Sequence, residues 1–190
     1  MRVMQDRVAV DPIPNPELRN GLWVPHETTT FVQDGEKASA ITKGKVIGFG
    51  PGKRRKDGTR RPLEEIREGD LAVFSDTAGK LLSNGIRIMR DDDVGAVIDK
   101  DGNAHARGDC VIVRPLPREE TTASGIRLFL NDEEPWRYGR AEDVGPRSTV
   151  KVGETVVYHY MDGQKFLSDR SDGRLIFREQ HLLGVLDDGR

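Results

Sequence analysis

Apolar residues along the chain occur in short runs, and the spacing within these runs predicts β-strands. Residues 86–88 alternate apolar and polar side chains, which is typical of a strand with one buried face. Residues 110–113 and 155–158 are largely apolar runs of the kind that a barrel or sandwich buries. No window of about eleven residues or more has the apolar spacing of an amphipathic helix. The pattern therefore predicts an all-β protein.

Asn-Gly and Asp-Gly dipeptides separate many of these runs. Two-residue hairpin turns of type I′ need positive φ at both central positions, and Asn, Asp and Gly adopt that conformation most readily. The dipeptides that mark such turns are Asp57-Gly58, Asn84-Gly85, Asp101-Gly102, Asp162-Gly163 and Asp172-Gly173. They predict that neighbouring strands pair in antiparallel hairpins.

The chain repeats its own pattern once. Residues 6–14 match residues 109–117 position by position at an offset of 103, and residues 85–90 match residues 173–178 at an offset of 88. The order of the intervening matches is unchanged: 21–24 with 125–128, 44–51 with 139–146, 68–74 with 152–158, and 97–99 with 185–187. A duplicated chain is read as two copies of one folding unit. We therefore expect two tandem, mostly antiparallel β-barrels, one at residues 1–102 and one at residues 103–190.

The two copies differ in length at two places. The segment after the first strand is nine residues shorter in the second copy, and much of residues 53–64 has no equivalent there. The missing segment includes the Asp57-Gly58 turn. We expect a hairpin in the first barrel that the second barrel lacks.

Composition and charge narrow the range of functions. The formal net charge is −2, so no global field attracts the chain to nucleic acid or lipid. The single cysteine, Cys110, excludes a disulfide scaffold and a thiolate zinc cluster, and a small buried thiol is its expected role. His26, His105, His159 and His181 lack metal-ligand spacing. With no signal core or membrane-spanning run, we expect a cytoplasmic protein without metal or cofactor.

Each copy resembles the GroES family of ten-kilodalton co-chaperonins. The first copy carries the family pattern at residues 6–10, 21–24, 44–52, 68–74 and 91–98. The second copy carries it at residues 119–128, 151–156 and 182–186, with Glu154 where the family pattern has Asp. The whole chain is similar to a tandem double co-chaperonin, as plastids and some large viruses are thought to carry. In those settings the compartment would be the host cytoplasm, or the plastid stroma after removal of a transit peptide.

The resemblance implies two GroES-like barrels with long mobile loops and a roof hairpin in the first barrel only. It also implies a homo-oligomeric ring that binds a GroEL-type chaperonin in the presence of ATP and closes the chamber around an unfolded client protein, with no catalysis of its own. The apolar tripeptides that would contact the chaperonin are Leu22, Trp23 and Val24 after the loop glycine Gly21, and Ile126, Arg127 and Leu128 after Gly125.

Two other functions fit parts of this sequence. The roof hairpin is basic, and it comprises Lys53, Arg54, Arg55, Lys56, Asp57, Gly58, Arg60 and Arg61. Such a cluster could bind nucleic-acid phosphates, but no aromatic residue is interleaved, so a solvated hairpin tip is the preferred interpretation. Medium-chain alcohol dehydrogenases contain a GroES-like barrel, yet they also need a dinucleotide-binding half and zinc ligands, which this sequence lacks. We therefore expect a protein that is not an enzyme.

Overall fold

The computed structural model describes most of the chain. The described residues are 3–13, 17–19, 22–24, 31–33, 36–38, 41–54, 56–61, 63, 66–75, 77–116, 135–160, 162, 164–165 and 173–186. Their regular structure is antiparallel β-sheet with two single-turn 3-10 helices, η1 (Asp91–Asp93) and η2 (Glu179–His181). The predicted all-β class is confirmed. In this part of the chain, no helix has the length and hydropathy needed to cross a lipid bilayer.

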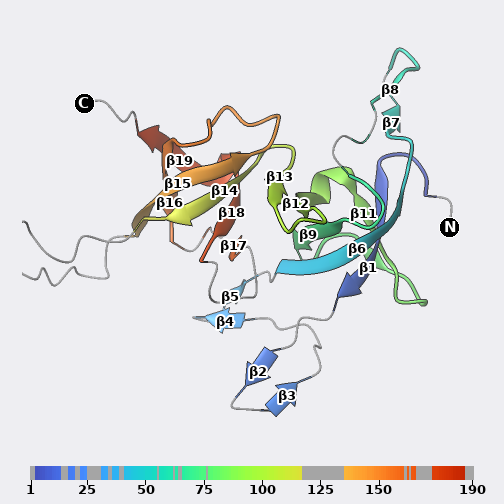
Figure 1. Ribbon diagram of the computed structural model, residues 1–190, viewed down its shortest axis with the longest axis horizontal. Helices are drawn as coiled ribbons and strands as arrows, with labels where there is room; N and C mark the ends of the chain where they lie inside the picture. Colours follow the sequence, from blue (N-terminus) through green and yellow to red (C-terminus); the bar gives the residue numbers. More distant parts are fainter. Residues whose placement is uncertain are drawn as a thin grey trace, which may run out of the picture.

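Two large sheets lie side by side along the longest axis of the molecule (Figure 1). The first sheet has the strand order β10-β11-β1-β6-β9-β12-β13. Its strands are β1 (Arg7–Ile13), β6 (Ile41–Phe49), β9 (Leu71–Ser75), β10 (Lys80–Leu81), β11 (Arg87–Arg90), β12 (Val94–Ile98) and β13 (Ala104–Ala106). The second sheet has the order β17-β18-β14-β15-β16-β19. Its strands are β14 (Cys110–Pro115), β15 (Trp136–Val144), β16 (Thr155–His159), β17 (Gln164–Lys165), β18 (Leu175–Arg178) and β19 (Leu182–Leu186).

The second sheet has the same strand order as the first sheet, except that its described strands include no equivalent of β13. The pairing register repeats as well: Ala9 lies opposite Ile88 in the first sheet, and Ile112 lies opposite Ile176 in the second. The register shift between Ala9 and Val10 in the first sheet recurs between Ile112 and Val113 in the second. A bulge displaces every following side chain, so its recurrence at the same place shows that the copies share their geometry in detail.

Three short hairpins complete the described strands. Strand β2 (Glu17–Arg19) pairs with β3 (Leu22–Val24), and β4 (Phe31–Gln33) pairs with β5 (Glu36–Ala38). Strand β7 (Lys53–Arg54) pairs with β8 (Arg60–Arg61) and projects above the first sheet in Figure 1. Residues 145–154, which are all described, connect β15 to β16 without a hairpin. The sequence therefore correctly predicts that the hairpin exists in the first copy alone.

Each sheet encloses its own apolar core, and a third cluster joins the two. The first core contains Val8, Val10 and Met89, and the second contains Val111, Val113 and Phe177, all 2% exposed or less. The joining cluster combines β9, β12 and β13 of the first sheet with β14 and β18 of the second, and its buried members are Val73, Ala96, Ile98, Ala106, Cys110, Ile112 and Ile176. Small and β-branched side chains suit such thin, closely spaced layers.

Strand β13 connects the sheets in an unexpected way. At the offset of 103, residues 104–106 correspond to residues 1–3, so they belong to the start of the second copy. Their backbone nevertheless pairs with β12 in the first sheet, with Ala106 opposite Ala96 and Ala104 opposite Ile98. The first segment of the second copy thus extends the sheet of the first copy (Figure 1).

A close backbone approach near this connection requires glycine. A Cβ atom at Gly145 would lie 2.5 Å from the carbonyl oxygen of Gly108 and 2.6 Å from the carbonyl carbon of Arg107. Gly50, its counterpart in the first copy, meets the backbone of Met4 and Gln5 in the same way. Neither neighbour is a flexible side-chain end, so the backbone itself would have to move.

We expect Gly145→Ala to lower the free energy of unfolding by about 1–3 kcal/mol, because overpacking a tight site forces a backbone shift. Gly184→Ala is the matched control, since no heavy atom lies within 4 Å of a Cβ at that position. The control should change the free energy of unfolding by less than about 0.5 kcal/mol. Denaturant midpoints measure both effects. Equal midpoints for the two variants would show that the Gly145 contact is not close.

Candidate functional site

The first predicted contact tripeptide lies in a hairpin outside the first sheet. Leu22–Val24 forms β3, and Leu22 lies opposite Arg19 of β2 (Figure 1). Gly21 lies outside the described residues, as do Gly125 and the second tripeptide, Ile126, Arg127 and Leu128. The connection that holds the first tripeptide joins β1 to β6, and the connection that holds the second joins β14 to β15. Both tripeptides therefore belong to the same connection of the repeated topology.

The predicted roof hairpin brings basic residues onto two short strands. Lys53 lies opposite Arg61, and Arg54 lies opposite Arg60. Asp57 at the turn accepts hydrogen bonds from the hydroxyl (2.6 Å) and backbone N–H (2.9 Å) of Thr59. These bonds lower the pKa of Asp57, so a carboxylate stays at the tip of the basic hairpin. Lys56 and Gly58 are exposed beside it, and Arg55 lies outside the described residues.

Residues suited to metal or thiol chemistry are not brought together in the described part of the chain, where no group of three or more metal-ligating side chains occurs. His105 lies 3.3 Å from Asp99 and 3.7 Å from Asp143. Cys110 is buried in the joining cluster, and burial raises the pKa of its thiol to about 11. A thiol with that pKa stays protonated near neutral pH, in agreement with the predicted buried thiol.

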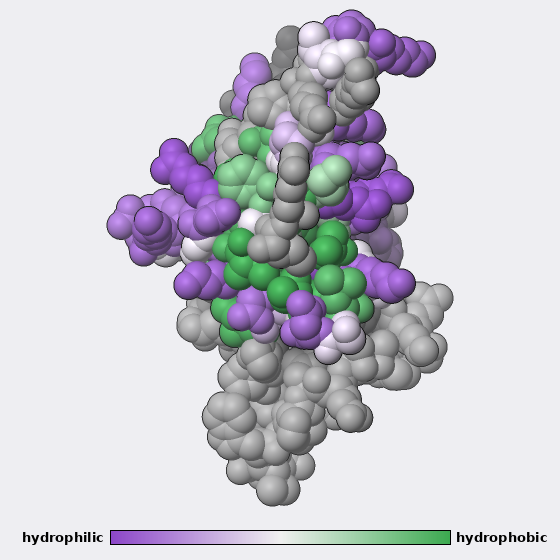
Figure 2. Space-filling view, turned by 90° about the vertical axis from the view of Figure 1, so that its right-hand side faces the viewer, coloured by the Kyte–Doolittle hydropathy of each residue, from purple (hydrophilic) through white to green (hydrophobic). Residues whose placement is uncertain are grey.

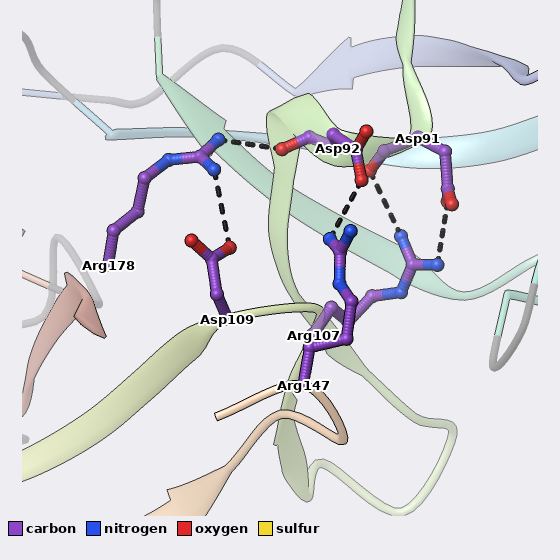
Figure 3. Close-up of polar contacts among 6 residues, drawn as sticks. All are labelled: Asp91, Asp92, Arg107, Asp109, Arg147 and Arg178. Carbon is purple, nitrogen blue, oxygen red and sulfur yellow. Dashed lines mark hydrogen bonds and ion pairs between the residues drawn. The ribbon is translucent and has the colours of Figure 1, made fainter. Parts of the chain in front are cut away.

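An arginine–aspartate network joins the two sheets at η1 (Figure 3). Arg107 is only 6% exposed, and its Nη2 donates to Oδ1 of Asp91 at 2.7 Å. Its Nη1 also donates to the Asp91 backbone oxygen at 3.4 Å. A buried guanidinium is costly unless a carboxylate and hydrogen bonds satisfy it, so Asp91 fixes where Arg107 lies.

Two further arginines contact the same short helix, one from the connection between β15 and β16 and one from β18. Arg147 donates to Oδ1 of Asp92 at 2.7 Å. Arg178 donates from Nη2 to the Asp92 backbone oxygen at 2.6 Å, and its Nη1 lies 3.4 Å from Asp109 (Figure 3). These pairs are partly exposed, so each contributes less to stability than the Arg107 pair. Together the three arginines orient the second sheet on η1.

Backbone contacts and the joining cluster complete this junction. The Arg107 N–H donates to the Gly95 oxygen at 2.9 Å, and the Ala106 N–H donates to Oδ2 of Asp143 at 3.0 Å. A Cβ at Gly95 would lie 3.0 Å from Cδ1 of Ile176, so only a glycine lets the sheets approach this closely without displacing that side chain. We call the joining cluster, the β12–β13 pairing and the arginine network the internal junction.

Sequence reasoning missed the internal junction. The sequence analysis includes residues 91–98 only as part of the family pattern, and the arginine partners of Asp91 and Asp92 lie 16, 55 and 86 positions away in the chain. A signal was nevertheless present in the repeat. The counterparts of Arg107 and Arg147 in the first copy are Met4 and Gly52, whereas Arg178 corresponds to Arg90. Charges that appear in only one copy can mark a contact between copies.

The sequence is similar to those of small chaperonin subunits from plants and bacteria. Residues 103–186 match the sequence model of the family described as Chaperonin 10 Kd subunit. The 10 kDa chaperonin of Brassica napus is 36% identical over 87 residues, which cover 44% of this chain and 88% of that protein. The mitochondrial 10 kDa chaperonin of Arabidopsis thaliana is 36% identical over 80 residues, which cover 40% of this chain and 81% of that protein. Co-chaperonin GroES of Citrifermentans bemidjiense is 32% identical over 104 residues, which cover 53% of this chain and 98% of that protein.

Fold and similarity together define a co-chaperonin built from antiparallel β-strands. Each relative is matched over most of its own length, and the strand order of the second sheet occurs twice in this chain. The chain belongs to the GroES family of 10 kDa co-chaperonins, as the resemblance implied.

Removing the carboxylate that faces Arg107 should weaken the internal junction. We expect Asp91→Asn to lower the free energy of unfolding by about 1.5–3 kcal/mol, because a buried guanidinium then loses its charged acceptor. Asp101→Asn removes the same charge from the exposed β12–β13 turn and should have little effect. Chemical denaturation measures both variants. If Asp91→Asn and Asp101→Asn lowered the free energy of unfolding by the same small amount, the Arg107–Asp91 pair would add nothing to stability.

Glu179 in η2 makes stability depend on pH. The backbone N–H (2.8 Å) and hydroxyl of Thr149 both donate to its carboxylate, which lowers the pKa of Glu179. Because the folded-state pKa lies below the unfolded value, this contribution is present above the unfolded pKa and is lost as pH falls through the folded pKa.

We therefore expect Glu179→Gln to lower stability at pH 7 by less than about 1 kcal/mol, since the group is mostly solvated. The difference from the parent chain should disappear once the pH falls below the lowered pKa of Glu179. Thermal unfolding at pH 7 and in acid measures the difference, and Glu68→Gln on an exposed turn is the control. A Glu179→Gln effect of equal size at both pH values would contradict the assignment.

Proposed function

We propose that this chain is a ring-forming co-chaperonin that binds a GroEL-type chaperonin in the presence of ATP and closes its chamber during protein folding. Membership of the GroES family supports a chaperonin partner and an oligomeric ring. The observation that carries the proposal is the repeated topology. The two sheets share one strand order, so the connection from β1 to β6 in the first is equivalent to the connection from β14 to β15 in the second. Each of these connections holds a tripeptide of the family pattern.

We propose that the chain comprises two domains, residues 1–102 and 103–190. The family match begins at residue 103, just before β13, which supports this division. Strand β13 then belongs to the second domain by sequence, although it pairs with the first domain's sheet.

The two tripeptides act as weak contacts that gain strength from number. Burying Leu22, Trp23 and Val24 would contribute roughly 1.5–3 kcal/mol each, while ordering each flexible backbone residue costs about 1–2 kcal/mol. One loop therefore binds weakly. Several loops on one ring bind tightly because every contact after the first is intramolecular. Weak single contacts also allow the ring to leave when the chaperonin changes state.

The second tripeptide differs from the first in the middle position. Ile126, Arg127 and Leu128 present one charged side chain where the first tripeptide presents Trp23. We assign the larger share of apolar contact to the first loop.

An unfolded client inside the chamber is the second partner, and the cytoplasm is the compartment that we propose.

Replacing Leu22, Trp23 and Val24 by Ser should abolish ATP-dependent co-elution with a GroEL-type ring, because the apolar contact surface of the first loop is removed. Size-exclusion chromatography with and without ATP measures the complex. Leu81→Ser changes an apolar residue of β10 that is 54% exposed and lies outside the loops, so it should leave binding intact. A complex that survives the triple substitution, or one that never forms with the parent chain, would overturn the proposal.

A further inference from the structure

We propose that the second sheet binds single-stranded nucleic acid through an exposed series of aromatic rings with an arginine near each end. We call this surface the aromatic strip, and its members are Trp136, Arg137, Tyr138, Arg140, His159 and Tyr160. The proposal goes beyond the co-chaperonin function and does not depend on it. The strip belongs to β15 and β16, whereas the basic hairpin β7–β8 lies apart from them, above the first sheet (Figure 1).

Strand β15 places two of the rings and one arginine on the same face. Side chains alternate between the two faces along a strand, so Trp136, Tyr138 and Arg140 point the same way. All three are exposed, whereas Gly139 and Ala141 are buried. Trp136 is 46% exposed and Tyr138 is 49% exposed. Two large aromatic side chains therefore remain about half accessible on a regular strand.

Strand β16 and the residue after it extend this surface. His159 lies opposite Trp136, and the two rings meet edge to face with their centroids 5.6 Å apart. Tyr160 stacks on His159 with a centroid distance of 5.0 Å, and it is 48% exposed. The Tyr160 N–H donates to the Pro135 oxygen at 3.0 Å. The sheet thus holds three rings in contact, with the fourth next to them on β15.

The first copy shows that the fold does not require these rings. The four equivalent positions there hold Ile41, Lys43, Ser75 and Asp76. The pairing register supports the correspondence, because Ile41 lies opposite Ser75 as Trp136 lies opposite its partner in β16. The same two strands therefore pair in the first sheet without an aromatic residue at any of these positions. An exposed feature that the fold does not need points to a binding role.

The arginines give the strip a positive charge. The guanidinium carbon of Arg137 lies 5.6 Å from the centre of the Tyr160 ring, which is a cation–π distance. Arg140 is exposed on the outer face of β15. Glu142, the nearest acidic residue along β15, forms an ion pair with Arg114. Its negative charge is therefore balanced within the sheet.

Single-stranded nucleic acid combines the two properties that this surface complements. Its bases present aromatic faces that stack on Trp and Tyr rings, and its phosphates pair with arginine. A duplex hides the base faces within its own stack and offers mainly phosphates. Asp162 is exposed in the turn after β16 and reduces the local positive charge. We therefore expect moderate affinity, with a dissociation constant of about 10⁻⁶–10⁻⁴ M.

Fluorescence anisotropy of a labelled oligodeoxythymidylate of about twelve nucleotides, titrated with the full chain, measures this binding. Tyr138→Ala should raise the dissociation constant roughly 5- to 100-fold, because one stacking surface is lost. Tyr138→Phe keeps the ring and should bind like the parent chain. A duplex of the same length should bind more weakly than the single strand.

Salt dependence separates stacking from charge. Arg140→Ala removes one phosphate contact, so it should reduce the slope of log affinity against log salt concentration by about 0.7. Tyr138→Ala should lower the affinity and leave that slope unchanged, because stacking on a neutral ring releases no counterions. Lys45→Ala is the matched control for Arg140→Ala, since Lys45 is exposed at the equivalent position of the first sheet. It should change neither quantity.

Two further measurements locate the site. The double variant Arg60→Ala and Arg61→Ala removes charge from the basic hairpin and should bind within about threefold of the parent. In a Trp23→Phe chain, Trp136 is the single remaining tryptophan, and the oligonucleotide should quench its fluorescence. Each variant must keep the circular dichroism spectrum of the parent. If Tyr138→Ala fails to fold, Tyr160→Ala replaces it, because Tyr160 follows β16 and lies outside the paired strands.

The proposal is overturned if the parent chain does not bind the oligonucleotide, if Tyr138→Ala binds like the parent, or if the hairpin variant loses as much affinity as Tyr138→Ala. A proline-rich peptide that quenches Trp136 where the oligonucleotide does not would make the strip a peptide site, which also overturns it. Chaperonin binding is measured separately. Loss of oligonucleotide binding with chaperonin binding intact contradicts the aromatic strip alone, and the reverse result contradicts the co-chaperonin function alone.

Discussion

The arrangement of the two large sheets depends on the contact between Arg107 and Asp91 beside the β12–β13 pairing. Arg107 is buried between the two sheets, and Asp91 accepts two of the hydrogen bonds that its guanidinium donates, which offsets the cost of burying that charge. The same contact holds β13 along the edge of the first sheet, where the Arg107 N–H donates to Gly95. Two small sheets, each with a thin core of its own, are thereby joined in a defined arrangement.

Much of the fold could be predicted from the sequence because two weak signals, the apolar runs and the turn dipeptides, recur in both copies of the repeat. Short apolar runs and Asp-Gly turns predicted strands, and their unchanged order in both copies predicted one topology used twice. The hairpin at residues 53–61 and its absence from the second copy followed from counting positions between glycines. These predictions depend on local pattern, which a single sequence contains.

The internal junction could not be predicted in the same way, because its residues come from distant parts of the chain. No local pattern in the sequence connects Asp92 to Arg147 or Arg178. Strand β13 pairs with the preceding sheet because Ala106 and Ile98 are then buried against the second sheet. This is a tertiary contact. The tripeptide of the second loop lies outside the described residues, so its role stays a prediction.

The most direct test of the co-chaperonin function is electron microscopy of the chain mixed with a GroEL-type ring and ATP. We expect a closed cap of β-domains on the ring, with residues 22–24 touching the rim. Rings that remain uncapped under saturating ATP and excess chain would contradict that function.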